Sequence, residues 1–169
     1  MAEKELLILD KKQIQQKTTR IAYQILEDSL DEQEIVIAGI ASQGYILAKR
    51  LKALLEEISS IKILLIKIEM NKASSHLDAT TDIDVNECAG KTVILVDDVL
   101  NNGRTLAYGL GVFLDLPLKK IRTVVMVDRS HRNFPISSDF TGLELATVLK
   151  EHVDVVLNEE TGEDAVYLR

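Results

Sequence analysis

The stretch that most constrains the fold covers residues 93–106 and reads VILVDDVLNNGRTL. It opens with four consecutive apolar residues, three of them β-branched. Such a run, bounded by turn residues, is typical of a strand in the middle of a parallel sheet. Two adjacent carboxylates, Asp97 and Asp98, follow it, then a polar loop containing Gly103, then apolar residues at helical spacing. The order strand, acidic pair, loop and helix predicts an α/β fold.

This order also indicates a ligand. In open α/β sheets, ligands lie outside the carboxyl ends of the strands. A loop entering a helix there offers unpaired backbone N–H groups, which suit a phosphate, and a glycine allows close approach of the backbone. Two carboxylates beside such a loop make sense if they accept hydrogen bonds from sugar hydroxyls, or if they hold a hard cation such as Mg²⁺. The sequence therefore favours a phosphorylated ribose as ligand.

The same residues resemble the phosphoribosyl pyrophosphate signature of type I phosphoribosyltransferases. The resemblance implies one domain over residues 1–169, with a mostly parallel central sheet flanked by helices and a flexible hood loop. It implies that Asp97 and Asp98 are catalytic, bind the ribose hydroxyls and hold Mg²⁺. The residues implied to grip the 5′-phosphate are Asn101, Asn102, Gly103, Arg104 and Thr105. Asn102 stands where Thr is usual, and its amide can still donate to a phosphate.

A second strand–loop–helix unit precedes the signature. Residues 35–40 form an apolar run, and residues 45–57 have apolar side chains at helical spacing. The resemblance implies that the loop between them, Ala41, Ser42, Gln43 and Gly44, binds pyrophosphate. It departs from the family pattern because no Lys or Arg lies near Ser42 or Gln43, which implies less positive charge for the leaving pyrophosphate. A plain strand–helix turn is the alternative.

A long polar stretch, residues 70–90, follows another apolar strand at residues 61–68. Long irregular connections inside compact domains are typically lids or binding loops. The family has a hood here that closes over the reacting centre and excludes water. The hood residues of interest are Lys72, Ser74, Ser75 and His76. Cys88, at the end of this stretch, is expected to be a small buried side chain.

A further apolar strand, residues 121–127, leads into the run DRSHRNFPISSDFTG. This run resembles two branches of the family, the hypoxanthine-guanine enzymes and, more closely, the pyrimidine-operon regulators that double as uracil phosphoribosyltransferases. The resemblance implies a nucleobase partner, with uracil favoured. The residues implied to surround the base are Asp128, Arg129, Phe140, Thr141 and Gly142. For the basic residues at 129, 131 and 132, a surface ion-pair cluster is the alternative.

The two ends of the chain carry short apolar runs. Residues 6–9 are expected to form a strand or an arm, and Asp10 to cap a helix that reaches about residue 30. Residues 153–157 and 165–168 are expected to form a closing hairpin around Gly162.

Composition excludes several classes of protein. A hydrophobic content of 46% predicts a globular chain rather than a disordered one. The net charge of −7 argues against a broad basic face for RNA, although a local basic patch stays compatible with it. A single cysteine excludes an internal disulfide. No apolar run is long enough to cross a membrane and no signal pattern is present, so a cytoplasmic protein is expected. The resemblance implies a homodimer.

The resemblance thus implies a phosphoribosyltransferase. It would transfer ribose 5-phosphate from phosphoribosyl pyrophosphate to a nucleobase and release pyrophosphate, without a covalent nucleophile. Two alternatives stay open: a nucleotide-sensing regulator of the RNA attenuation type, and a non-catalytic nucleotide-binding module. The uncharged loop at residues 41–44 motivates the second of these.

Overall fold

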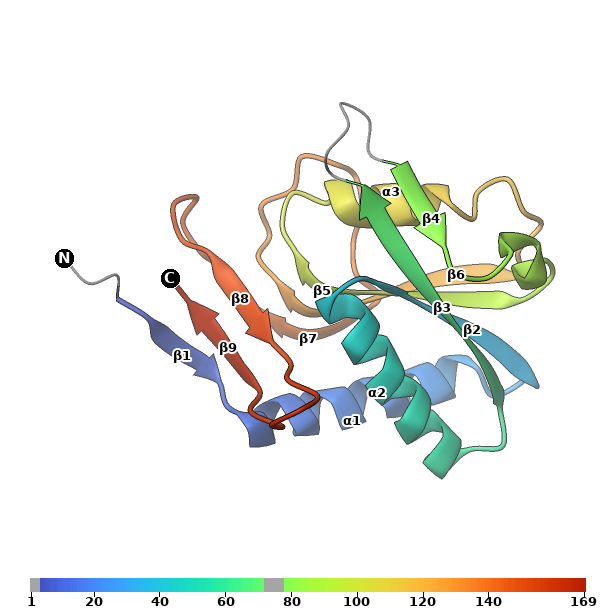
Figure 1. The fold of residues 1–169 in the computed structure, drawn as a ribbon, viewed down its shortest axis with the longest axis horizontal. Coiled ribbons are helices and arrows are strands. Elements are labelled where there is room, and N and C mark those ends of the chain that lie inside the picture. Colours follow the sequence, from blue (N-terminus) through green and yellow to red (C-terminus); the bar gives the residue numbers. More distant parts are fainter. Residues whose placement is uncertain (1–3, 72–77) are drawn as a thin grey trace.

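A six-stranded sheet forms the centre of the molecule (Figure 1). The computed structural model describes residues 4–71 and 78–169. In sheet order the strands are β4 (Asp78–Thr81), β3 (Lys62–Asn71), β2 (Glu34–Ile40), β5 (Thr92–Leu100), β6 (Lys120–Asp128) and β7 (Phe140–Glu144). All neighbouring pairs are parallel except β3 and β4. This mostly parallel sheet, flanked by helices, confirms the predicted α/β class.

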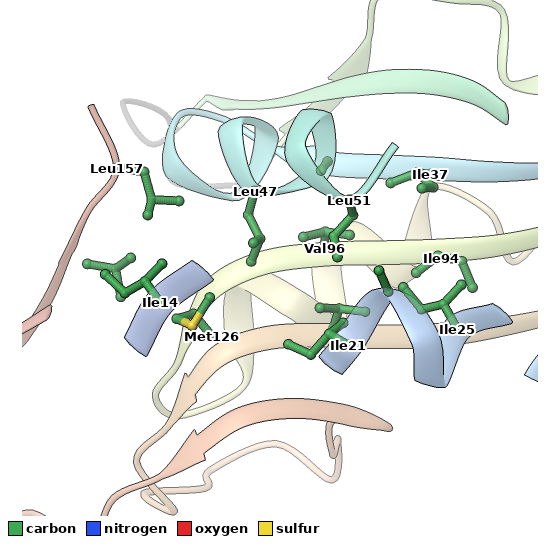
Figure 2. Close-up of a cluster of buried hydrophobic side chains, with 14 of the residues drawn as sticks. Ile14, Ile21, Ile25, Ile37, Leu47, Leu51, Ile94, Val96, Met126 and Leu157 are labelled. Carbon is green, nitrogen blue, oxygen red and sulfur yellow. The ribbon is translucent and has the colours of Figure 1, made fainter. Parts of the chain in front are cut away.

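Helices cover both faces of the sheet. They are α1 (Lys11–Asp28), α2 (Gln43–Ile58) and α3 (Arg104–Gly111). Successive side chains of a strand point to opposite faces. Ile35 and Ile37 of β2 therefore pack in one core cluster with α1 and α2, which Figure 2 shows, whereas Val36 and Ala38 pack in a second cluster on the side of α3. The central strands are buried on both faces, which explains their continuous apolar sequences.

The start of α1 follows from its sequence. The Asp10 side chain accepts a hydrogen bond from the Gln13 N–H at 2.8 Å, and the Gln13 side chain accepts one from the Asp10 N–H at 2.9 Å. This reciprocal pair is a capping box, which satisfies two backbone donors at the helix start. The predicted cap is confirmed.

A second, three-stranded antiparallel sheet joins the two ends of the chain (Figure 1). Its order is β1 (Leu6–Leu9), β9 (Ala165–Leu168) and β8 (Val153–Val156). The predicted closing hairpin is confirmed, and β1 is a strand on its edge. Val153, Val155 and Val166 belong to the same core cluster as α1 and α2, so this sheet packs on the main core.

The expectation of a long irregular stretch at residues 70–90 is wrong in part. Strand β3 continues to Asn71, and β4 pairs with it in antiparallel register, with Met70 opposite Ala79. A 3₁₀ turn, η1 (Val85–Cys88), follows. The sequence of β4 has no apolar run that would predict a strand, because an edge strand with exposed faces carries polar residues. Cys88 is buried as predicted, and burial raises the pKa of its thiol.

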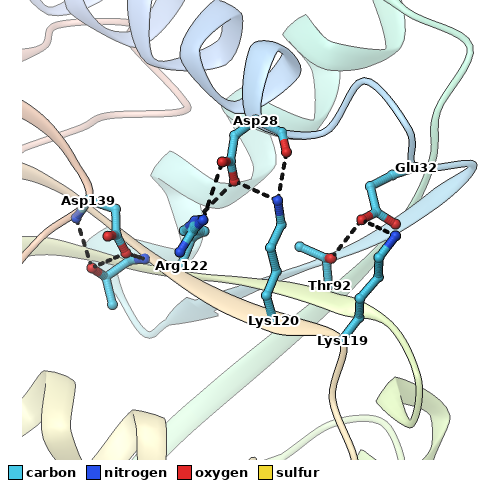
Figure 3. Close-up of polar contacts among 8 residues, drawn as sticks. Asp28, Glu32, Thr92, Lys119, Lys120, Arg122 and Asp139 are labelled. Atoms are coloured by element: carbon cyan, nitrogen blue, oxygen red, sulfur yellow. Dashed lines mark hydrogen bonds and ion pairs between the residues drawn. The ribbon is translucent and has the colours of Figure 1, made fainter.

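The edge of the sheet at the amino ends of β5 and β6 carries a network of ion pairs (Figure 3). Asp28, at the end of α1, pairs with Lys120 and Arg122, each at 3.0 Å, and Glu32 pairs with Lys119 at 2.8 Å. Burial raises the pKa of Asp28, but hydrogen bonds from Arg122 and Lys120 outweigh that effect and hold this pKa below its ordinary value. The hydrogen bond from Lys119 likewise lowers the pKa of Glu32.

Candidate active site

A cavity of about 290 Å³ lies at the carboxyl ends of the adjacent strands β2 and β5. Its wall contains both acidic residues of the signature and residues from both predicted phosphate loops. The sequence-predicted residues that line it are Ala41, Ser42, Gln43, Asp97, Asp98, Asn101 and Thr105. The fold therefore brings together two motifs that lie more than fifty residues apart in the chain.

The acidic pair is oriented by the backbone. Asp98 N–H donates to Oδ1 of Asp97 at 2.9 Å, and Val99 N–H donates to Oδ1 of Asp98 at 2.8 Å. Asp97 is buried, at 7% exposure, and Asp98 is half-buried. The strand does not end at the carboxylates, as the sequence suggested, because β5 runs on to Leu100. A carboxylate oxygen accepts more than one hydrogen bond, so the pair can also serve hydroxyl groups or a cation.

The loop before α2 offers backbone donors. Ser42, at the start of the helix, makes no capping hydrogen bond with its side chain, and the first N–H groups of a helix have no partner within the helix. The helix dipole adds partial positive charge at this end. Gly44 is required for close approach, because a Cβ there would lie 2.8 Å from the Val96 carbonyl oxygen and 2.9 Å from Asp97 Cα. The geometry fits an anion beside the acidic pair.

The loop before α3 is shaped by Gly103, which has φ 90° and ψ −2° and precedes the helix. The Asn102 side chain accepts the Arg104 N–H at 2.9 Å, and the Asn102 carbonyl accepts the N–H groups of Asn133 and Phe134. Asn101 and Thr105 face the cavity, whereas Asn102, Gly103 and Arg104 do not line it. The left-handed conformation of Gly103 thus gives the loop its tight turn.

A second cavity, of about 680 Å³, shares Asn101 with the first and is bounded by Asn102, Arg129 and Thr147. Arg129 is buried, at 6% exposure. Its guanidinium donates to Asn101 Oδ1 and to Thr147 Oγ1, each at 3.0 Å, and to the carbonyls of Val148 and Glu151. Arg129 therefore ties the loop before α3 to the segment at residues 147–151.

The other residues predicted to surround a base lie elsewhere. Asp128 accepts the Ser130 N–H and forms an ion pair with Arg132 at 2.6 Å, so part of the predicted ion-pair cluster is present. Phe140, Thr141 and Gly142 belong to β7, and none of them lines either cavity. Strand β7 ends two residues further on, at Glu144.

The side chain of Arg20 binds the carbonyls of Thr141 and Gly142, at 3.1 and 2.7 Å. Gly142 is needed for packing, because a Cβ there would lie 2.4 Å from the Met126 carbonyl oxygen. The lining residues that the sequence did not indicate include Met70 and Val153 at the first cavity and Thr147 and Val148 at the second. These apolar and small polar residues carry no motif that points to a site.

The hood residues Lys72, Ser74, Ser75 and His76 lie outside the described residues. Over the described ranges, no group of three or more His, Cys, Asp or Glu side chains could hold a metal by itself. Mg²⁺ is commonly held by one or two carboxylates together with substrate phosphates. Asp97 and Asp98 fit that donor set. No helix of the described chain is long and apolar enough to span a membrane.

Comparison with known proteins identifies the family of the chain. The model of the phosphoribosyl transferase domain matches residues 7–160. The chain therefore belongs to the phosphoribosyltransferase family, as the signature indicated.

Among individual proteins, the chain is 35% identical to the bifunctional protein PyrR of Fusobacterium nucleatum, over 99% of both chains. It is 33% identical to the pyrimidine operon regulatory protein of Lactococcus lactis, over 100% of this chain and 98% of that protein. The hypoxanthine phosphoribosyltransferase of Trypanosoma cruzi has the same fold, with a TM-score of 0.78 at 19% identity over 99% of this chain and 97% of that one.

Proposed function

We propose that this protein transfers ribose 5-phosphate from phosphoribosyl pyrophosphate to a nucleobase, uracil before purines, and releases pyrophosphate. The observation that carries the proposal is the 290 Å³ cavity in which Asp97 and Asp98 meet the loops before α2 and α3. A ribose with phosphate groups at both ends needs hydroxyl acceptors between two sets of phosphate donors. Residues of both loops and both carboxylates line the cavity, which supports this arrangement, and the neighbouring cavity at Arg129 is the proposed place for the base.

In the proposed reaction, the bond between C1 of ribose and the pyrophosphate oxygen breaks, and a bond between C1 and a ring nitrogen of the base forms. The ring nitrogen loses its proton to solvent. Such transfers pass through a state with oxocarbenium character, as glycoside cleavage does. The carboxylates of Asp97 and Asp98 accept the ribose hydroxyls and favour the positive charge on the ring.

The two loops bind the ends of the sugar phosphate. The loop at residues 101–105 binds the 5′-phosphate, and the loop at residues 41–44 binds the pyrophosphate through backbone N–H groups. Asp97 and Asp98 would hold Mg²⁺ shared with the substrate, which supplies positive charge to the pyrophosphate as it leaves. Remote binding of the phosphate serves to orient C1 toward the base.

The experiment is an assay of pyrophosphate release from phosphoribosyl pyrophosphate and Mg²⁺ with uracil, hypoxanthine, guanine, xanthine and adenine. The control is the double variant Asp97→Asn/Asp98→Asn. Release with one base that is lost in the variant supports the proposal and identifies the base. If no base gives release while the sugar phosphate still binds, the enzyme proposal is wrong and the non-catalytic module replaces it.

A second candidate function is a nucleotide-sensing regulator that binds RNA. The observation that favours it is the similarity, over nearly the whole chain, to proteins named as a pyrimidine operon regulator and as bifunctional PyrR. The net charge of −7 counts against it. Steeply salt-dependent binding of pyrimidine-operon leader RNA, modulated by a uridine nucleotide, would establish this function. Salt-independent or absent binding would eliminate it.

A further inference from the structure

The loop before α2 lacks a basic side chain but contacts the C-terminal hairpin of β8 and β9. Gln43, the first residue of α2, lines the 290 Å³ cavity. Its side-chain oxygen Oε1 accepts the backbone N–H of Leu157 at 2.7 Å. A backbone N–H can only donate, so the amide oxygen is the atom that faces Leu157. The other end of the amide is the nitrogen Nε2, with two N–H donors.

Leu157 is a fixed anchor for this contact. Its side chain is 2% exposed and belongs to the core cluster that contains Leu47 of α2 and Ile14 of α1, as Figure 2 shows. A side chain packed on two helices cannot shift without opening the core. The N–H of Leu157 therefore holds the Gln43 amide in one orientation relative to the helix.

Two ion pairs fasten the same hairpin to α2. The guanidinium of Arg50 binds both carboxylate oxygens of Asp164, at 2.6 and 3.0 Å, and Lys49 pairs with Glu159 at 2.5 Å. Asp164 Oδ1 also accepts the N–H of Asn158, the residue after Leu157, at 3.0 Å. The Asp164 side chain is only 7% exposed. These contacts fix the backbone on the far side of Leu157 as well.

We infer that the Gln43 amide is a side-chain anion donor of the loop before α2, and that Leu157 positions it by binding its amide oxygen. The amide nitrogen then donates to the pyrophosphate group, in place of the basic side chain that the loop lacks. A neutral amide supplies hydrogen bonds without adding charge beside Asp97 and Asp98. The C-terminal hairpin is thereby part of the substrate site, although none of its residues carries a recognisable motif. This inference rests on the proposed function.

The test compares two variants by calorimetric titration with inorganic pyrophosphate and Mg²⁺. Gln43→Glu keeps an oxygen for the Leu157 N–H but replaces the N–H donors with a negatively charged oxygen. We expect it to retain the wild-type thermal midpoint and to bind pyrophosphate about tenfold more weakly or worse. Gln43→Met removes both the acceptor and the donors, and we expect weaker binding together with a lower thermal midpoint. The matched control is Gln16→Glu, which makes the same change of charge at an exposed position of α1.

The outcomes separate the inference from the function on which it rests. If Gln43→Glu binds pyrophosphate as tightly as the wild type while Gln43→Met does not, Gln43 only fastens the hairpin and the inference is wrong. If Gln16→Glu weakens binding as much as Gln43→Glu, the effect is one of net charge and the inference is again wrong. If the wild type binds neither pyrophosphate nor phosphoribosyl pyrophosphate, the proposed function fails and the inference with it.

Discussion

Charged side chains are arranged differently at the two ends of the parallel strands in the central sheet. At the amino ends of β5 and β6, Asp28 and Glu32 each face basic side chains within 3.0 Å. At the carboxyl end of β5, the acidic pair accepts N–H groups of the strand itself, and Asp98 has no ion-pair partner within the described ranges. A carboxylate held in an ion pair stabilises the fold, whereas the acceptor atoms of Asp98, which has no such pair within the described ranges, are suited to bind a ligand. The comparison separates residues that stabilise the fold from residues proposed to bind the substrate.

The largest effect is expected from Asp98→Asn, because the amide keeps the shape of the side chain but loses its charge. We expect the rate of transfer to fall by about 100-fold or more, as for other residues that stabilise charge in a transition state. The free energy of unfolding should stay near the wild-type value. Steady-state pyrophosphate release and urea unfolding of the same preparation measure the two quantities. A variant that transfers normally would remove Asp98 from the proposed site.

The next largest effect is expected on stability, from alanine substitutions at two glycines with positive φ, one at each end of β5. Gly103 has φ +90°, and a Cβ there would lie 2.6 Å from Cγ2 of Ile136, whereas Gly90 has φ +75° and open space around it. We expect Gly103→Ala to cost about 2 kcal/mol or more and Gly90→Ala about 1 kcal/mol, since only the first adds a clash to the backbone strain. Urea unfolding of both variants gives the difference. Equal costs would mean that Ile136 moves aside.

Asp28→Asn should lower the free energy of unfolding and leave the rate of transfer unchanged, the reverse of what we expect for Asp98→Asn. It leaves Lys120 and Arg122 without their carboxylate at a site where the Asp28 side chain is 26% exposed. We expect the free energy of unfolding to fall by about 1 kcal/mol, because solvent screens such partly exposed pairs, and the rate of transfer to stay unchanged. A loss of transfer in a variant that remains folded would contradict the separation between the two edges.

The smallest expected effect is a loss of stability at low pH, which arises from Asp28 and Glu32. The folded-state pKa values of Asp28 and Glu32 lie below their ordinary values of 3.8 and 4.5. The unfolded chain therefore binds protons first as pH falls, so this stabilisation is complete above about pH 5 and is lost as pH falls through the folded-state values. Urea unfolding between pH 3 and pH 7 should show this decline, and Asp28→Asn should make it shallower. An unchanged slope in that variant would mean that Asp28 contributes nothing.

Much of the fold could be predicted because its signals are local. Each of these signals predicts the structure of the residues that carry it: the apolar runs around Ile37 and Ile94 predict strands, and Asp10 predicts the start of a helix. The acidic pair with Gly103 likewise pointed to the edge of the sheet where the cavity lies. By contrast, β4 and β7 are short strands at the two edges of the sheet. The mostly polar sequence of β4 and the glycine inside β7 leave neither with an apolar run that predicts a strand.

The rest of the site could not be predicted because it depends on contacts across the fold. Val153 reaches the cavity only because β8 joins a sheet with β1 and β9. Arg129 resembled a base-binding residue, yet its guanidinium is engaged by Asn101, Thr147 and backbone carbonyls. Nothing in a sequence shows which donors of an arginine are already used.

The place of β8 and β9 in the core also bears on folding during synthesis. Val153, Val155, Leu157 and Val166 complete a cluster that Ile14 and the apolar side of α2 begin. These strands are synthesised after every other described element, so the nascent chain exposes that apolar surface until they arrive. The hairpin of β8 and β9 thus buries the exposed surface, and its loop supplies the Leu157 N–H that binds the Gln43 side chain. Completion of the core and completion of the proposed site therefore both depend on the hairpin of β8 and β9.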